Sequence, residues 1–244
     1  MKNTSKIAIV GGLSGLAAYL FLVRPQQAKS DAEDEENRKN FNQLPLKAHS
    51  FLAGVPLYTV GFTKLEGGRE NMSMKEIYEA VGLSDIGKIE LGPVTKGLFW
   101  LRTLIGEILR WDDVPELAQS VSYLPRLSAE ERAKSLIPPG KVAGISQVLY
   151  CYENEIMLEI INKTVHCFWG LALERAPDGY NVYNAVYVKD LNWRTPIYMT
   201  LVSPVLKWVI YPAIEKSIRE NWECEFPKSY RRGRIVEAEY ESER

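Results

Sequence analysis

The sequence predicts an α+β fold in which an antiparallel sheet is covered by a long C-terminal helix, preceded by a single N-terminal transmembrane helix. Three observations support this prediction. Residues 7–23 carry no charge, residues 146–192 hold four apolar segments separated by short polar turns, and residues 196–214 are apolar with one charge. Strands joined by such short turns pair antiparallel. The composition, 46% hydrophobic with a net charge of −1, is typical of a globular protein.

The uncharged segment at residues 7–23 is predicted to be a membrane anchor. As a helix it would cover about 25 Å, which is short but sufficient for a bilayer. Lys6 and Arg24 flank it and can extend their charges to the two membrane surfaces. A cleaved signal peptide and a soluble buried helix are the alternatives, and neither a good cleavage site nor an amphipathic pattern favours them. We therefore expect a single-pass membrane protein, with its compartment and orientation left open.

The composition of the sequence divides the chain into four parts. The anchor covers residues 1–24, an acidic linker 25–44, the α+β domain 45–228 and a charged tail 229–244. Pro25 blocks continuation of a regular helix out of the anchor. Since the charges of the linker repel one another, we expect a solvated spacer that forms a few helical turns at most.

Short helices are predicted in the first half of the α+β domain. Asn71 or Ser73 can cap the first of them. Residues 94–111 carry apolar side chains at helical spacing, which predicts a second helix with a broad apolar face. Ser128 and Glu131 have the spacing of a capping box and predict a third helix.

Four strands are predicted next, at residues 146–152, 156–161, 165–174 and 180–192. The segment Ala176–Gly179 has the sequence APDG, in which Pro and Asp-Gly favour a tight turn. Because the other connections are also short, the strands are expected to form a meander in one curved sheet.

The long C-terminal helix is predicted at residues 195–222. Thr195 suits its cap and Pro196 its first position, while Pro204 and Pro212 should bend or break it. Contact with a membrane surface and a second membrane span are alternatives for its apolar half. A lysine near the centre and the two prolines disfavour the span.

This order of elements resembles the START-like, or helix-grip, architecture of the polyketide-cyclase-like superfamily. Residues 149–222 resemble an uncharacterised START-like bacterial family. The resemblance lies in the strand IMLEIINKTVHCFWGLAL, in the later segment YNVYNAVYVKDLNWRTPIYMTLVSPVLKWVI, and in the placement of Asn192, Arg194, Tyr198 and Pro204 where the helix begins. Because that family has no assigned chemistry, the resemblance implies neither an activity nor a cofactor.

The resemblance implies a binding site, since helix-grip proteins hold apolar ligands between the concave face of the sheet and the C-terminal helix. Side chains alternate along a strand, so the more apolar face of residues 165–174 would line that space. An ordinary filled core is the alternative interpretation. The residues expected to bind the ligand are Val165, Cys167, Trp169, Leu171, Leu173, Tyr198 and Leu201.

Several functional classes are disfavoured. The chain has no HExxH, GxSxG or phosphate-loop motif, and its three cysteines lack metal-site spacing. Of the two histidines, His49 lies in an apolar stretch and His166 lies on a predicted strand with no carboxylate nearby in the sequence, so neither is expected to be a catalytic base. The near-zero net charge argues against nucleic-acid binding. We therefore expect no catalytic residue, no metal site, no cofactor and no enzymatic activity.

Two functions of different classes remain. The first is a membrane-tethered domain that binds or carries a lipid or other hydrophobic small molecule. The second is a non-catalytic accessory or structural subunit of a membrane protein complex. The 6 tryptophans and 13 tyrosines suit either one. A cavity under the C-terminal helix would favour the first, and a packed interior with an exposed apolar patch the second.

Overall fold

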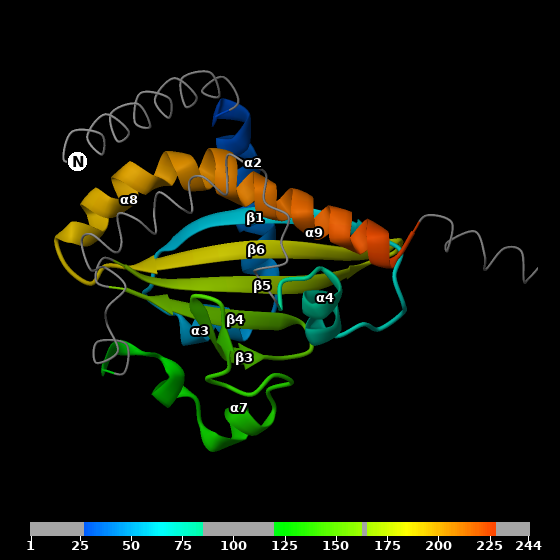
Figure 1. Ribbon diagram of the computed structural model, residues 1–244, viewed down its shortest axis with the longest axis horizontal. Coiled ribbons are helices and arrows are strands. Elements are labelled where there is room, and N and C mark those ends of the chain that lie inside the picture. The colour runs from blue at the N-terminus through cyan, green and yellow to red at the C-terminus, as the bar shows by residue number, and fades with distance from the viewer. Residues whose placement is uncertain (1–26, 85–119, 163–164, 228–244) are drawn as a thin grey trace, which may run out of the picture.

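An antiparallel sheet of six strands forms the centre of the molecule (Figure 1). The computed structural model describes residues 27–84, 120–162 and 165–227. The strand order is β1-β6-β5-β4-β3-β2, so the first strand lies beside the last. The predicted α+β class and antiparallel pairing are confirmed. The strands are β1 (Leu57–Glu66), β2 (Val142–Ala143), β3 (Ser146–Cys151), β4 (Glu155–Ile161), β5 (His166–Ala176) and β6 (Gly179–Lys189).

Two of the helices begin where the sequence predicts. The capping box of Ser73 and Glu76 opens α4, and that of Ser128 and Glu131 opens α7, so both predicted starts are confirmed. The helices are α2 (Gln27–Gln43), α3 (Lys47–Phe51), α4 (Met74–Ala80), the 3-10 turn η3 (Leu124–Arg126), α7 (Ala129–Ala133), α8 (Arg194–Val205), the π-helical η4 (Leu206–Ile210) and α9 (Tyr211–Glu225).

Three predictions fall outside the described residues. They are the anchor at residues 7–23, the helix at 94–111 and the charged tail at 229–244. Across the three described ranges, no helix combines the length and the apolar character that a bilayer span requires.

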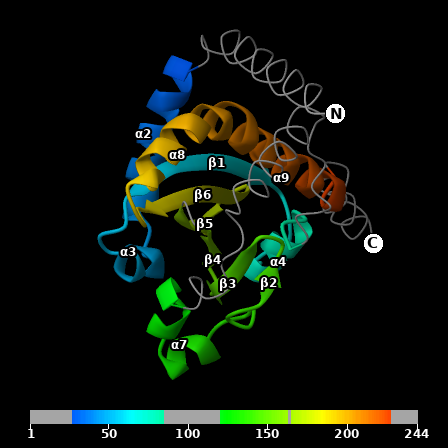
Figure 2. The same ribbon diagram turned by 60° about the vertical axis from the view of Figure 1, so that its left-hand side comes forward.

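The C-terminal helical rod of α8, η4 and α9 runs across one face of the sheet (Figure 2). Its π-helical turn lies between Pro204 and Pro212, as expected where a proline removes a backbone donor from the helix. The predicted cap is wrong in detail. The helix follows Trp193, and the hydroxyl of Thr195 instead accepts a hydrogen bond from the backbone N–H of Leu191 at 3.1 Å.

Both faces of the sheet are buried. Towards α9, Leu171 and Leu173 pack in one apolar cluster with Ile218 and Trp222. On the opposite face, side chains such as Phe168 pack in a second cluster with α2 and α3. The alternation along β5 therefore sends the predicted apolar set towards the C-terminal rod, but the other set is also covered.

The predicted spacer at residues 25–44 is replaced by the packed helix α2, which is a correction to the sequence interpretation. Asp34 accepts a hydrogen bond from the backbone N–H of Val60 at 2.6 Å, and Arg38 donates to backbone carbonyls of β1. Phe41, only 1% exposed, lies in the core. β1 is an edge strand, whose free backbone groups need partners. The polar side chains of α2 supply them, which composition could not reveal.

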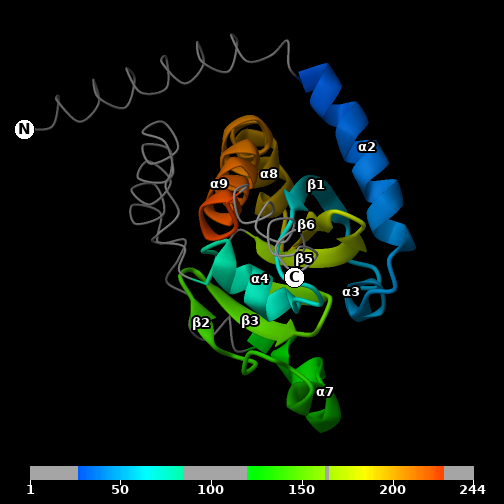
Figure 3. The same cartoon turned by 90° about the vertical axis from the view of Figure 1, so that its right-hand side faces the viewer.

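Figure 3 shows the consequence for the architecture: β1 lies between α9 on one side and α2 on the other. β1 was missed as a strand in the sequence. Its segment contains Gly61, which weakens a strand pattern, and its partner β6 is more than a hundred residues away, with Val60 opposite Ala185. No local turn signal in the sequence can indicate a pairing between strands so far apart in the chain.

Candidate functional site

The residues expected to bind a ligand lie in three places: Val165 directly precedes β5, Tyr198 and Leu201 lie in α8, and the other four, Cys167, Trp169, Leu171 and Leu173, lie in β5. Leu171 and Leu173 belong to the cluster with Trp222, and Val165 belongs to a smaller apolar cluster beneath α8. Trp169 contacts both clusters. Around Val165 pack Cys167, Trp169 and Tyr198, all half-buried, and Leu201 lies in α8.

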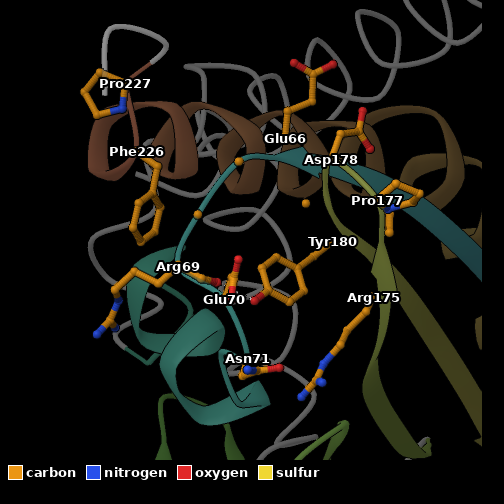
Figure 4. Close-up of a pocket in the computed structure, with 14 residues that line it drawn as sticks. Glu66, Arg69, Glu70, Asn71, Arg175, Pro177, Asp178, Tyr180, Phe226 and Pro227 are labelled. Carbon is orange, nitrogen blue, oxygen red and sulfur yellow. Dashed lines mark hydrogen bonds between the residues drawn. The ribbon is translucent and has the colours of Figure 1, made fainter. Parts of the chain in front are cut away.

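Two cavities in the described part of the molecule are large enough to hold a small molecule. The first, of about 530 Å³, lies at the turn between β5 and β6 (Figure 4). The second, of about 440 Å³, lies between α2, β1 and the beginning of α9. None of the seven expected residues lines either cavity, and Leu171 and Leu173 are themselves packed in the apolar cluster beneath α9.

Polar side chains of mixed charge line the first cavity, and they do not converge. Arg69 and Arg175 extend in different directions in Figure 4. Arg69 forms an ion pair with Glu76 at 3.0 Å. The hydroxyl of Tyr180 donates to the carbonyl of Arg69 at 2.5 Å and accepts from the N–H of Met72 at 2.9 Å. These interactions hold the loop after β1, so we assign this cavity a structural role.

The floor of the second cavity is built from two cross-strand neighbours, Gly61 of β1 and Asn184 of β6. Both lie on the face towards the C-terminal rod, because Asn184 also pairs with Leu171 of that face. Glu215 reaches down from α9, and its carboxylate lies where a side chain at residue 61 would be. The absence of a side chain at Gly61 therefore lets the carboxylate lie on the sheet.

Asn184 connects this floor to the predicted site. It is only 3% exposed, and its side-chain oxygen accepts a hydrogen bond from the indole N–H of Trp169. An indole nitrogen can only donate, so the orientation of the amide is fixed. The amide nitrogen of Asn184 is left as a donor, and no described residue accepts its hydrogen bonds.

The carboxyl group of Glu215 has an unusual titration. Burial raises its pKa to about 7, while nearby Arg219 opposes the rise and Glu33 adds to it. None of the described residues donates a hydrogen bond to it or forms an ion pair with it. A carboxylate without a partner in such a place is costly when charged. Glu215 is therefore poised between its neutral and charged forms near neutral pH.

Acidic side chains dominate the walls of the second cavity. Asp34 pairs with Arg38 at 2.6 Å and accepts hydrogen bonds from Thr59 and Val60 of β1. These interactions keep the pKa of Asp34 below its usual value, even though burial acts to raise it. Lys207 lies 3.8 Å from Asp31. The walls consist of Asp31, Glu33, Asp34, Glu36 and Asn37 from α2, with Lys207, Tyr211 and Pro212 from the C-terminal rod and Phe62 from β1.

The structure also contains a buried pair that the sequence interpretation missed. His166 and Glu159 lie 2.7 Å apart, and both side chains are 0% exposed. Burial acts to raise the pKa of Glu159, but hydrogen bonds from His166, Ser122 and other neighbours lower it overall. The hairpin of β4 and β5 brings the two residues together. Since no solvent reaches them, we regard the pair as a structural link to the segment that contains Ser122.

Nucleophilic and metal sites find no support in the described residues. Burial raises the pKa of both Cys151 and Cys167 to about 12, so neither thiol is ionised near neutral pH. No group of three or more His, Cys, Asp or Glu side chains in the described ranges is arranged to hold a metal ion.

Comparison with known proteins gives one match. A family described as "Protein of unknown function (DUF2867)" matches residues 63–213, well over half of the chain. No curated protein matches, and neither does any solved structure. The matched range runs from within β1 through the sheet to the beginning of α9, so it contains Trp169 and, of the residues lining the second cavity, Asn184, Lys207, Tyr211 and Pro212. The chain therefore belongs to the DUF2867 family of proteins of unknown function.

Proposed function

We propose that this protein binds or carries a hydrophobic small molecule or lipid between its sheet and its C-terminal rod, as a membrane-tethered START-like domain. The observation that carries the proposal is the second cavity, of about 440 Å³, beneath the start of α9. Its floor residue Asn184 is hydrogen-bonded to Trp169, the central residue of the expected binding face. A cavity of this size suits a small ligand.

The apolar part of the ligand is placed on the side of this cavity that lies towards α8. Tyr211 lines the cavity and also packs against the cluster that contains Val165. Around that cluster, Cys167, Trp169 and Tyr198 are only half-buried, whereas Trp222 beneath α9 is 1% exposed. These side chains beneath α8 are thus more exposed than Trp222 beneath α9. Ligand binding beneath α8 would bury apolar surface, at about 25 cal/mol per Å².

The helix-grip assignment and the tether belong to the same proposal. An antiparallel sheet with a C-terminal helix across one face supports the helix-grip assignment. The tether rests on the uncharged segment at residues 7–23 of the sequence. As in the sequence interpretation, no catalytic step is included in the proposed function.

Binding is tested with the full-length chain held in an amphipathic polymer and titrated with the neutral fluorescent probe N-phenyl-1-naphthylamine. We expect saturable binding of one probe per chain. Gly61→Phe is the matched control, because a ring at residue 61 would fill the cavity floor, and it should abolish the saturable signal. Equal signals from both proteins, or no saturable signal from the native chain, would overturn the proposal.

The accessory-subunit function remains a second candidate because one feature favours it. Trp193, Val142 and Ile145 expose 72%, 72% and 66% of their surface. All three lie at the same end of the sheet, in the β2–β3 hairpin and in the segment after β6. Exposed large apolar side chains are typical of interaction surfaces. If Trp193→Ser removed the chain from a membrane complex in its host while leaving probe binding unchanged, the second function would gain support.

A further inference from the structure

We propose that the ligand is an amphiphilic amine with an oxygen acceptor beside its ammonium group, and that this head group lies in the second cavity between Glu215 and Asn184. The inference rests on the proposed function and names the chemical class of its ligand. Three features of the cavity support it: the excess of carboxylates, the unused donor of Asn184 and the aromatic ring of Tyr211 in the wall.

The charge balance favours a cation. Of the five acidic residues that line the cavity, Asp34 is neutralised by Arg38, and Asp31 lies near Lys207. Within the described part of the chain, Glu33, Glu36 and Glu215 have no ion-pair partner. A partly buried carboxylate without a partner gains most from a cation that replaces its lost solvation. An ammonium group placed in the cavity beside this carboxylate would pair directly with Glu215.

Asn184 provides the second and independent feature. Its residue surface is 97% buried, and it faces the cavity with an amide nitrogen that lacks a partner in the described residues. Because Trp169 already occupies the side-chain oxygen, only a hydrogen-bond acceptor can use the remaining site. The ligand should therefore carry a hydroxyl or carbonyl oxygen close to its ammonium, as an amino alcohol does.

The surrounding wall suits the same head group. Tyr211 lines the cavity from the rod, and an aromatic ring attracts an organic cation through its face. Tyr211 also contacts the cluster under α8, so an alkyl chain attached to the head group can continue towards Trp169. The cavity volume, about 440 Å³, accommodates the head group and the first part of such a chain.

The binding should depend on pH in a defined direction. Glu215, whose pKa is about 7, becomes charged as the pH rises, and only the charged form pairs with an ammonium group. The other titratable or charged groups around it are Asp31, Glu33, Asp34 and Glu36 from α2, with Lys207, Tyr211 and Arg219 from the rod. Affinity for the amine should therefore increase between pH 6 and pH 8.

Isothermal titration of the full-length chain in an amphipathic polymer tests the inference with four probes of equal chain length. They are N-dodecylethanolamine, dodecylamine, 1-dodecanol and laurate, each used below its micelle concentration. We expect the amino alcohol to bind several-fold tighter than dodecylamine, which lacks the acceptor for Asn184. It should bind at least about tenfold tighter than laurate at pH 8, since an added charge-assisted hydrogen bond is worth about a factor of ten or more.

Two variants assign the effect to Glu215. Glu215→Gln should weaken binding of the amino alcohol about tenfold and abolish its pH dependence. Glu220→Gln is the matched control on the same helix, because Glu220 pairs with Lys216 on the exposed surface, and it should change neither. Circular dichroism confirms that the variants are folded. Glu33→Gln should also weaken binding of the amino alcohol, but by a smaller factor. Glu33 lines the cavity from α2, so this variant leaves the side chains beneath the rod unchanged.

The outcomes separate this inference from the proposed function. If laurate and dodecanol bind as tightly as the amines and Glu215→Gln changes nothing, the ligand is not a cation and this inference is overturned, while apolar binding stands. If dodecylamine equals N-dodecylethanolamine, the role of Asn184 is wrong. If none of the probes binds, the proposed function itself fails.

Discussion

The carboxylate of Glu215 lies directly above Gly61, in the space that a side chain at residue 61 would occupy. One residue comes from the edge strand β1 and the other from α9, more than 150 positions later in the chain. The contact depends on the missing side chain, since even a methyl group would displace the carboxylate. It therefore connects the packing of the C-terminal rod to the electrostatics of the cavity.

Gly61→Ala should move the carboxylate of Glu215 away from the sheet and towards solvent. Because burial is the main cause of its raised pKa, that pKa should fall from about 7 towards the ordinary value of 4.5. The end of a flexible side chain can yield, so the loss of stability should be small, about 1 kcal/mol or less. Carboxyl chemical shifts measured by NMR over a pH series would report the pKa. A value that stays near 7 would show that the contact does not control the titration.

The stability of the native protein should decrease as the pH rises from 4.5 to 7. Glu215 has a pKa of about 7 in the folded chain, above the ordinary glutamate value of 4.5, so the unfolded chain loses this proton first. A shift of this size corresponds to about 3 kcal/mol at full burial, and partial solvation reduces it to about 1–2 kcal/mol.

Chemical denaturation at pH 5 and pH 7.5 measures this contribution. Glu215→Gln should remove about 1–2 kcal/mol of the decrease, whereas Glu220→Gln, on the exposed face of the same helix, should retain it. If the native chain and Glu215→Gln show the same pH dependence, the carboxyl of Glu215 is not buried as described.

The tight turn between β5 and β6 makes a second test of the fold. Gly179 has a φ of 150°, and a side chain there would collide with the backbone of β1, including the carbonyl of Leu65 and the N–H of Gly67. Backbone atoms of a paired strand cannot move aside cheaply. Gly179→Ala should therefore cost about 2 kcal/mol or more.

Gly54→Ala is the matched control for the turn. Gly54 also has a positive φ, 81°, but a side chain there would meet no atom within 4 Å. It should cost only the backbone strain, about 1 kcal/mol. Denaturation midpoints of the two variants separate strain from collision. Equal losses would mean that β1 does not pack closely against the turn.

The parts of the fold that local patterns encode were predictable. Strands β3 to β6 follow one another with short turns between them. The serines that cap α4 and α7 are each followed three residues later by the glutamate of the capping box. β1 was not found because its partner lies far along the chain. The role of α2 was missed because acidic composition predicts solvation, whereas this segment bonds the free edge of β1.

The candidate site was only partly predictable. The alternation of its strand places Trp169 on the face towards the C-terminal rod, and the sequence of β6 contains a further signal: Asn184 interrupts an apolar face between Val182 and Val186. A buried amide on such a face needs a partner, so it marks a polar contact. Glu215 could not be assigned, because its position above Gly61 depends on the register between α9 and β1.

The last prediction concerns the attachment of α2 to the sheet. Asp34 accepts hydrogen bonds from Thr59 and Val60 at 2.6 Å each and pairs with Arg38. Asp34→Ala leaves these donors without their acceptor and should cost about 2–3 kcal/mol. Because the pKa of Asp34 is lowered in the folded chain, its contribution is present above pH 4 and disappears as the pH falls below that value.

A matched substitution on the same helix distinguishes this contact from a general loss of helix charge. Glu36 lines the same cavity, but none of the described residues bonds it, so Glu36→Ala should change the unfolding free energy by less than about 0.5 kcal/mol. Asp34→Ala should also uncover the edge of β1 and promote aggregation on heating. Thermal denaturation followed by light scattering measures both effects. If the two variants behave alike, α2 does not serve as the cover of the edge strand, and the wall of the cavity loses its anchoring contact.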